Sequence, residues 1–270
     1  MTRAVSRLLA PPAFARRRLA GSRRRVRARL APAFGALAIA AMPAAARAEG
    51  TPPETAAPVD AALSNDTTLT TWAHPAEVLP IYVAPNVHAR EITRIRPYTE
   101  DGFPEVYLLL ESRTDATGHE WVRLRIPGRP NGRVGWVLRQ ALGGFHVTSW
   151  RARINLSLRR MTLYFDGRKR LVAPVGVGKP STPTPTGHFW VRERFKIRDR
   201  SSPYFPWAIG TSAYSVLTDW PGGGIVGIHG AFGEPWRIPG DPSHGCVRML
   251  PGDLDRIAPL LSPGVPVDIV

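Results

Sequence analysis

The stretch IVGIHGAFGEPWRIPGDPSHGCVRM, residues 225–249, is the part of the chain that says most about its fold and its chemistry. Its apolar, β-branched run at 225–228 ends in His229 and Gly230, a pattern typical of a short strand that stops at a loop. A spacer leads from there to Ser243, and the segment after it contains Cys246, which is the only cysteine of the chain. The stretch therefore predicts a strand followed by a tight turn that carries a thiol.

The residues around this thiol are of the types that activate a cysteine. A thiol attacks only as the thiolate, and its pKa near ~8.5 must be lowered by a base or by positive neighbours. His229, His244 and Arg248 are close to Cys246 in sequence and can supply such surroundings. Gly245 suits a tight turn in which backbone N–H groups converge on a reacting oxygen. Cys246 is therefore a candidate nucleophile.

Less specific interpretations of the same residues stay open at this point. A single cysteine is also explained as a small buried residue, and the histidines and the arginine can have purely structural roles. Two histidines and one cysteine could bind zinc, although structural zinc sites use four protein ligands and no second cysteine exists. The residue types alone do not choose between catalytic, structural and zinc-binding roles.

Two separate blocks resemble one family in the right order. The pattern IHG…SHGCVRM resembles the L,D-transpeptidase catalytic domain, which has a His, a spacer and then Ser/Thr-His-Gly-Cys-apolar-Asn/Arg. The block VGVGKPSTPTPTGHFWV, residues 175–191, is similar to the segment that leads into a core strand of that family. The resemblance covers roughly residues 150–270, and every motif position is filled.

The resemblance implies a role for each residue of the motif. Cys246 is expected to be the nucleophile, and His229 the proton donor and acceptor, oriented by the backbone carbonyl of Gly230. His244 would support the site, and the backbone N–H groups of Gly245 and Cys246 are the expected oxyanion donors. The expected substrate-binding residues are Ser243, whose hydroxyl would also fix the turn, and Arg248, which would hold the site's shape or meet a substrate carboxylate. Three aromatic residues could line the donor cleft, with core packing the favoured alternative: Tyr204, Phe205 and Trp207.

The resemblance also implies the reaction. The expected activity joins peptidoglycan stem peptides through a cysteine thioester, with no cofactor and no metal. Three alternatives remain: an L,D-carboxypeptidase in which water takes the thioester, an enzyme that anchors a lipoprotein lysine to the wall, and a non-catalytic cell-wall-binding protein. The sequence says nothing about oligomeric state.

The net charge of +15 does not indicate a nucleic-acid partner. Residues 1–48 contain eleven Arg and neither Lys nor an acidic residue, which leaves 25 basic and 21 acidic residues, or +4, for residues 49–270. A nucleic-acid-binding protein is expected to keep its basic patch in the folded part. No nucleic acid is therefore expected among the partners.

The arginine-rich start predicts an export signal over residues 1–48. Basic residues precede an Ala-rich apolar run at 30–46, and Ala46-Arg47-Ala48 fits the small-x-small rule of signal peptidase. The run is shorter than the ~20 residues of a membrane span and contains Pro32, so we expect cleavage and no stable membrane span afterwards. The expected location is the periplasm or the cell wall and extracellular space.

The remaining chain predicts a mainly β fold in two domains. A Pro-, Ala- and Thr-rich stretch predicts a flexible linker over 49–71. Residues 72–148 contain short β-like runs, and GHEWVRLRIPGRPNGRVGWVLRQAL, residues 118–142, resembles the end of a bacterial SH3-like β-barrel. Trp121 and Trp136 are expected in its core. The expected strands of this domain are 79–83, 92–95, 106–110, 121–126 and 134–138.

Residues 149–270 are expected to form the catalytic domain, a β-sandwich or barrel. Asp166-Gly167 predicts a hairpin turn between two of its strands. The helix signal of this domain lies near 253–258, where Asp253 could cap the helix and Pro259 limits it. The expected strands are 154–158, 163–165, 171–177, 189–197 and 225–229.

Overall fold

The computed structural model describes residues 60–65, 67–219 and 221–270. The chain divides into two units, Met1–Pro53 and Glu54–Val270, and all described residues belong to the second. The predicted signal peptide, residues 1–48, and the predicted linker up to residue 59 lie outside the described residues. No described helix has the length and apolar character needed to cross a membrane.

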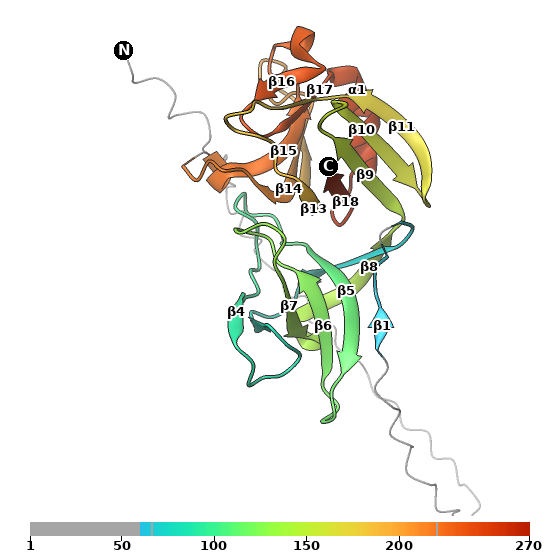
Figure 1. Ribbon diagram of the computed structural model, residues 1–270, viewed down its shortest axis with the longest axis vertical. Helices are drawn as coiled ribbons and strands as arrows, with labels where there is room; N and C mark the ends of the chain where they lie inside the picture. Colours follow the sequence, from blue (N-terminus) through green and yellow to red (C-terminus); the bar gives the residue numbers. More distant parts are fainter. Residues whose placement is uncertain (1–59, 66, 220) are drawn as a thin grey trace, which may run out of the picture. The chain divides into compact units, whose positions relative to one another are not determined.

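The first sheet is built from the strands before residue 149 (Figure 1). Its strand order is β4-β3-β7-β6-β5-β2-β8, and β1 pairs with β5 outside this path. The alternating residues of these strands enclose a core that contains Ile81, Leu109 and Leu124. The bounds are β1 Ala61–Ala62, β2 Thr70–Pro75, β3 Pro80–Tyr82, β4 Glu91–Arg94, β5 Tyr107–Thr114, β6 Glu120–Arg125, β7 Val134–Leu138 and β8 Leu142–Thr148.

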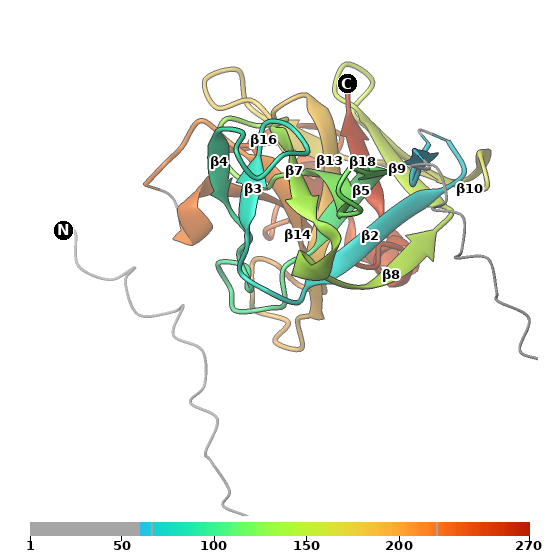
Figure 2. The same ribbon diagram turned by 90° about the horizontal axis from the view of Figure 1, so that it is seen from below.

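The first sheet begins earlier in the chain than the expected linker allows. Within the predicted linker the structure describes 60–65 and 67–71, which hold β1 and the start of β2. Thr70 and Thr71 are buried there because β2 pairs with both β5 and β8, as Figure 2 shows for β2 and β8. Each of the five strands expected in this part corresponds to an observed strand, but β2 and β8 lacked a clear apolar period. Whether this sheet is SH3-like stays a prediction.

The second sheet follows the order β11-β10-β9-β18-β13-β14-β15-β17-β12-β16. Most neighbours are antiparallel, but β9 and β18, β15 and β17, and β12 and β16 are parallel pairs. The bounds are β9 Trp150–Asn155, β10 Arg160–Phe165, β11 Arg168–Pro174, β12 Gly176–Gly178, β13 Gly187–Lys196, β14 Trp207–Tyr214, β15 Ile225–Gly230, β16 Gly240–Ser243, β17 Val247–Met249 and β18 Pro266–Ile269. The mainly β fold is thereby confirmed.

The helix α1, Pro251–Ile257, begins two residues before the predicted cap. Pro251 occupies its first turn and Leu250 precedes it without a side-chain cap, so Asp253 lies inside the first turn and does not cap the helix. Proline is favoured there because its missing N–H has no intrahelical partner in any case. Leu254 and Ile257 of α1 pack into the core of the second sheet.

The side-chain alternation of three neighbouring strands positions the candidate site. Ile209 of β14, Ile228 of β15 and Val247 of β17 all belong to the buried core of the second sheet. Successive side chains of a strand point to opposite faces. Gly227, His229 and Arg248 therefore lie on the face of the sheet opposite that core.

The two sheets contact each other through a buried ion pair. Glu105, which precedes β5, is fully buried, and Arg192 of β13 is 2% exposed. Arg192 Nε donates to Glu105 Oε1 at 2.7 Å, and Nη2 donates to Oε2 of the same carboxylate. Beside this pair, Trp190 Nε1 donates to the Val106 carbonyl at 2.7 Å. These contacts tie β13 to the first sheet.

Candidate active site

His229 and Cys246 come together because β15 and β17 are parallel neighbours (Figure 1). Ile228 is aligned with Val247, and His229 with Arg248. Cys246 directly precedes β17, and its Sγ lies 3.4 Å from the backbone nitrogen of Gly227. Because Gly227 and His229 face the same side of β15, the thiol and the imidazole share one face of the sheet.

The imidazole of His229 is buried and held in one tautomer. Its Nδ1 lies 2.9 Å from the carbonyl oxygen of Gly230. A carbonyl only accepts, so Nδ1 carries the proton and Nε2 is left as an acceptor. Burial lowers the pKa of His229 to about 4, opposed by the Gly230 hydrogen bond and assisted by the charge of Arg248. His229 is therefore a neutral base at neutral pH.

Cys246 is a thiol rather than a thiolate in these surroundings. Burial raises its pKa, while the Gly227 N–H and the positive charge of Arg248 act in the opposite direction. A neutral thiol must lose its proton before it can attack.

The residues Ser243–Cys246, here called the thiol turn, are closed by the Ser243 hydroxyl. This hydroxyl donates to the Cys246 carbonyl at 2.5 Å and accepts from the Gly245 N–H at 3.1 Å. Ser243 is only 1% exposed. The expected turn-fixing contact is therefore present, and the expected substrate contact of Ser243 stays a prediction.

Gly245 makes one contact that the motif did not indicate. Its φ of +124° is a conformation that suits glycine, as a tight turn requires. Its N–H, however, donates to the Ser243 hydroxyl at 3.1 Å, and its expected part as an oxyanion donor stays a prediction. The backbone N–H of Cys246 is the other candidate donor in this turn.

The loop between β12 and β13 supports the thiol turn from behind. Thr184 Oγ1 donates to the Gly245 carbonyl at 2.8 Å and accepts from the Gly178 N–H at 2.8 Å. The Lys179 N–H donates to the Ser243 carbonyl at 3.0 Å. The sequence motif at 175–191 thus contacts the motif at 243–249, and Thr184 is a contributor that the residue pattern alone did not single out.

His244 lies at the exposed rim of the turn. Its Nε2 lies 3.1 Å from the ammonium nitrogen of Lys179. Loss of solvent lowers its pKa, and the charges of Lys179 and Arg248 lower it further. His244 is therefore a neutral group at the entrance of the site.

Arg248 is buried on the same face as His229. Its Nη1 pairs with Glu234 Oε2 at 3.0 Å, and its guanidinium lies 4.6 Å from the ring centroid of Phe232. Its Nε has no hydrogen-bond partner within the described part of the chain. Phe232 and Glu234 come from the spacer between the two halves of the motif, where no sequence signal marked them.

Of the three aromatic residues considered, Tyr204 contacts the site. Its ring meets the His229 ring edge-on at 4.9 Å between centroids. Burial raises the pKa of Tyr204, and the nearby Cys246 raises it further. Trp207 instead packs against the core and donates to Asp255 at 2.9 Å, as core packing predicts.

Gly230 brings Tyr204 to the histidine. The Gly230 N–H donates to the Tyr204 carbonyl at 3.3 Å. A Cβ at this position would lie 1.7 Å from the Phe205 carbonyl, so only glycine allows this approach. The carbonyl of Gly230 thus orients the His229 ring. Because Gly230 has no side chain, the backbone of Tyr204 and Phe205 can approach it closely.

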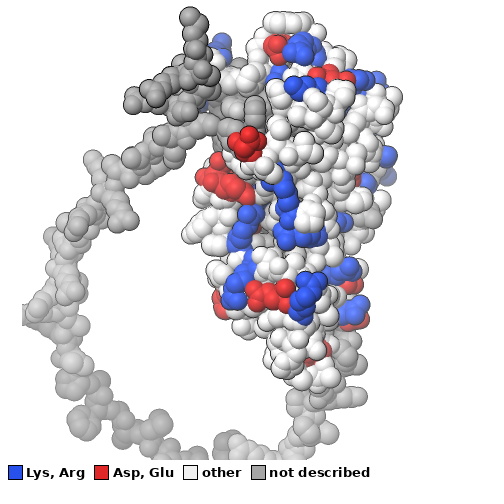
Figure 3. Space-filling view, turned by 60° about the vertical axis from the view of Figure 1, so that its left-hand side comes forward, with Lys and Arg blue, Asp and Glu red and all other residues white. Residues whose placement is uncertain are grey.

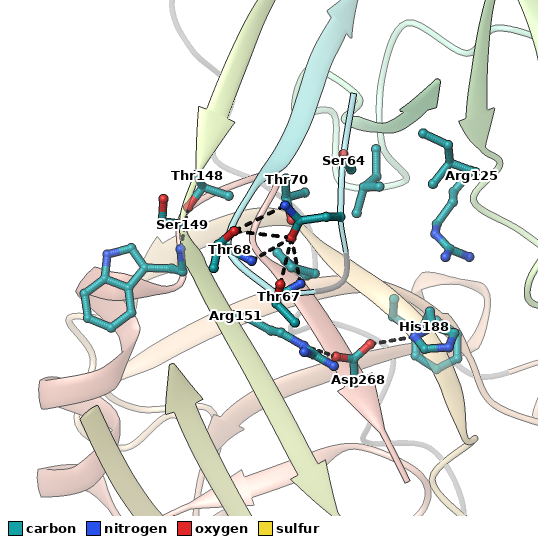
Figure 4. A pocket seen from close by; sticks show the side chains of 16 residues that line it. Ser64, Thr67, Thr68, Thr70, Arg125, Thr148, Ser149, Arg151, His188 and Asp268 are labelled. Atoms are coloured by element: carbon teal, nitrogen blue, oxygen red, sulfur yellow. Dashed lines mark hydrogen bonds and ion pairs between the residues drawn. The ribbon is translucent and has the colours of Figure 1, made fainter. Parts of the chain in front are cut away.

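A pocket away from these residues has a different lining (Figure 4). It is rich in hydroxyl groups and contains Asp268, which pairs with Arg151 and lies 2.7 Å from His188 Nδ1. Neither Cys246 nor His229 lines it. In the described ranges, no group of three or more His, Cys, Asp or Glu is placed to hold a metal ion.

Charge is distributed without a dominant sign on the face drawn in Figure 3. Basic and acidic side chains alternate over its described residues. This fits the small net charge of residues 49–270 and differs from the continuous basic surface of nucleic-acid-binding proteins.

Comparison with known proteins finds similarities over the residues of the second sheet. A family model of the L,D-transpeptidase catalytic domain matches residues 149–269. L,D-transpeptidase 1 of Mycobacterium tuberculosis is 26% identical over 203 residues, which cover 68% of this chain and 78% of that protein. The putative L,D-transpeptidase YkuD of Bacillus subtilis is 28% identical over 116 residues, covering 43% and 63%.

Solved structures of the same kind are also similar. The catalytic domain of Enterococcus faecium L,D-transpeptidase is 25% identical and covers 45% of this chain and 96% of its own, with a TM-score of 0.34. The Ldtfm–avibactam carbamoyl enzyme is 26% identical with a TM-score of 0.35, and this chain spans 48% of its length. By this family match, residues 149–269 are similar to the L,D-transpeptidase catalytic domains.

Proposed function

We propose that the chain is an exported L,D-transpeptidase that cross-links peptidoglycan stem peptides through a thioester on Cys246. The main support is the His229 imidazole: it is buried, fixed by the Gly230 carbonyl at 2.9 Å, and lies on the same sheet face as the sole thiol. A neutral base beside a thiol is the arrangement that nucleophilic catalysis by cysteine needs.

The first step is attack by sulfur. His229 Nε2 takes the proton of Cys246, and the sulfur attacks the carbonyl between the L-centre of diaminopimelate and the terminal D-Ala of a tetrapeptide stem. The developing oxyanion is stabilised by the Cys246 N–H. The C–N bond breaks, D-Ala leaves with the proton from His229, and a thioester remains.

The second step releases the thiol. A side-chain amine of a neighbouring stem attacks the thioester carbonyl, the C–S bond breaks, and the amine proton returns through His229 to the sulfur. Arg248 lies on the same face and pairs with Glu234 at 3.0 Å, and we assign it to holding the shape of the site. Transfer instead of hydrolysis requires that the amine be held and water be kept out.

The deciding experiment is mass spectrometry of products from disaccharide-tetrapeptide substrates, with wild type and Cys246→Ala. We expect free D-Ala and a cross-linked dimer from wild type and neither product from the variant. D-Ala without dimer would mean an L,D-carboxypeptidase. Product formation that Cys246→Ala leaves unchanged would reject the cysteine mechanism and favour a wall-binding protein.

Two further tests concern metal dependence and export. We expect a chelator to leave activity unchanged, because the mechanism uses only the thiol and the imidazole; loss of activity would favour zinc. We propose that residues 1–48 direct export to the periplasm or cell wall. Cell fractionation, with N-terminal sequencing of the mature protein, tests this proposal, and a retained leader would contradict it.

A further inference from the structure

The end of the hairpin between β14 and β15 joins the first sheet to the thiol turn. Residues 214–217 and 222–224 of this hairpin, here called the hairpin end, contact the loop between β6 and β7 on one side and the thiol turn on the other. We propose that Arg129 and Asn131, in the loop between β6 and β7, are positioning residues for Cys246 and act through this hairpin end. The inference rests on the proposed function, because it assigns these residues a part in acyl transfer.

Arg129 binds three backbone carbonyls of the hairpin end. Its Nη2 donates to Ser215 O at 2.8 Å and to Leu217 O at 3.0 Å, and its Nη1 donates to Gly223 O at 2.8 Å. Its Nε also reaches Ser215 O at 3.3 Å. Since Ser215 and Gly223 lie on opposite arms of the hairpin, one guanidinium holds both arms together. Hydrogen bonds from a charged donor are stronger than neutral ones.

Asn131 binds the first arm of the hairpin in a strand-like manner. Its Nδ2 donates to the Tyr214 carbonyl at 2.9 Å, and its Oδ1 accepts from the Tyr214 N–H at 3.1 Å. The side-chain amide thus satisfies both backbone groups of one residue, as a neighbouring strand would. Arg129 adds a contact with the Tyr214 ring, 5.0 Å from its centroid.

The opposite side of the hairpin end contacts the thiol turn. A Cβ at Gly245 would lie 3.1 Å from Ser215 Cβ, so these residues are in close contact. Immediately after the hairpin end, the Ile225 carbonyl lies 4.0 Å from Cys246 Sγ and the Gly227 nitrogen 3.4 Å from it. The sulfur is therefore located by backbone groups that continue directly from the residues bound by Arg129.

The packing leaves little freedom for substitution around this guanidinium. A Cβ at Gly224 would lie 2.6 Å from Arg129 Nη2 and 2.0 Å from the Leu217 carbonyl. Without Arg129, the carbonyls can turn to water, and the position of Cys246 relative to His229 becomes less defined. Small misplacements of reacting groups cost on the order of 100-fold in rate.

The test distinguishes correct placement of the Cys246 thiol from simple accessibility of that thiol. In the full chain, wild type, Arg129→Ala, Asn131→Ala and Arg129→Lys are compared with the control Arg113→Ala. Arg113 pairs with Asp60 and stacks on Trp136, so its partners belong to the first sheet and its flank. A carbapenem probes acylation, which needs the assembled site, and iodoacetamide probes alkylation, which needs only an accessible thiolate.

We expect Arg129→Ala to lower the carbapenem acylation rate, followed by intact mass, by roughly 10-fold or more, and the alkylation rate by less than about threefold. Asn131→Ala should act in the same direction, Arg129→Lys should recover part of the rate, and Arg113→Ala should match wild type. Wild-type acylation in both Arg129→Ala and Asn131→Ala, or an equal loss with both reagents, would overturn the positioning role. Absence of acylation in wild type itself would instead count against the proposed function.

Discussion

At the scale of single residues, the site combines a neutral imidazole with a neutral thiol. Burial of His229 makes its charged form costly, and the Gly230 carbonyl fixes the proton on Nδ1. Burial of Cys246 likewise disfavours the thiolate. Both side chains are therefore neutral near pH 7. In the proposed mechanism, His229 acts as the base when it takes the proton of Cys246.

The pH dependence of acylation follows from this state. Because the pKa of His229 is about 4, the acid limb of carbapenem acylation is expected near pH 4 and not near 6.5. Folded His229 binds its proton less well than the unfolded chain, so its contribution to stability is complete above about pH 6.5 and is lost as pH falls through about 4. Rates measured from pH 3.5 to 8 check the first statement.

A matched control for this prediction is His88→Gln, since His88 is exposed and lies in the first sheet's region. The variant should retain the wild-type pH profile. An acid limb at pH 6 to 7 in wild type would contradict a neutral buried base.

At the scale of elements, the loop between β12 and β13 contains two buried threonines with different surroundings. Thr184 bridges Gly178 and Gly245 through its hydroxyl. Thr182 is also buried, but within the described residues its hydroxyl has no hydrogen-bond partner. Thr182 is therefore a matched control for substitutions of Thr184.

Replacing each threonine by the isosteric valine should have different consequences. Thr184→Val leaves the partly buried Gly178 N–H and the buried Gly245 carbonyl without their partner, which costs about 1–3 kcal/mol for a fully buried group, and it should also slow acylation. Thr182→Val removes an unsatisfied hydroxyl and should leave stability unchanged or increase it. Urea unfolding and carbapenem acylation measure both effects, and equal losses in the two variants would reject the support role of Thr184.

At the scale of the whole molecule, the two sheets share the ion pair of Glu105 and Arg192. Glu105→Ala leaves the guanidinium buried without its main partner, which typically costs about 3–5 kcal/mol. The matched control is Glu111→Ala, whose carboxylate pairs with the exposed Arg123 at 3.2 Å and should contribute less than about 1 kcal/mol. Urea denaturation of both variants checks the difference; a similar small loss in each would mean that the contact between the sheets is weak.

Another contact between the two sheets, the hydrogen bond of Thr99 to Glu193, is expected to depend on pH. Glu193 of β13 is 4% exposed and accepts from Thr99 Oγ1 at 2.6 Å. Burial, followed by the neighbouring Asp101, raises the pKa of Glu193 to about 7, against the opposing effects of Thr99 and Arg192. At neutral pH this carboxyl therefore titrates within the folded protein.

The sign of its effect on stability is set by that raised pKa. The folded state keeps the proton of Glu193 where the unfolded chain has lost it, so stability is largest below about pH 4.5 and decreases as pH rises through about 7. Glu193→Gln should lack this decrease, while Glu111→Gln should retain it. Urea unfolding between pH 4.5 and 8 measures both, and an unchanged profile in Glu193→Gln would contradict the assignment.

The sequence predicted the elements whose signals are local. The β-branched runs gave strands such as Val134–Leu138 and Ile225–Gly230 close to their observed bounds, and Pro259 correctly limited the short helix. The spacing of His229 and Ser243–Met249 indicated the two halves of the site. Such signals can be recognised in a sequence because a strand's alternation and a turn's glycine depend on immediate neighbours.

Other features were decided by the tertiary structure, because they depend on which distant segments meet. The N–H of Gly245 donates to the Ser243 hydroxyl, and the Gly245 carbonyl accepts from Thr184, contacts that the motif alone did not indicate. Arg129 reaches the hairpin end across 86 residues of sequence. The sequence by itself indicated the chemistry that we propose for Cys246 and His229. The pairing of β15 with β17 and the burial of both groups decided where they are held and how their protons are distributed.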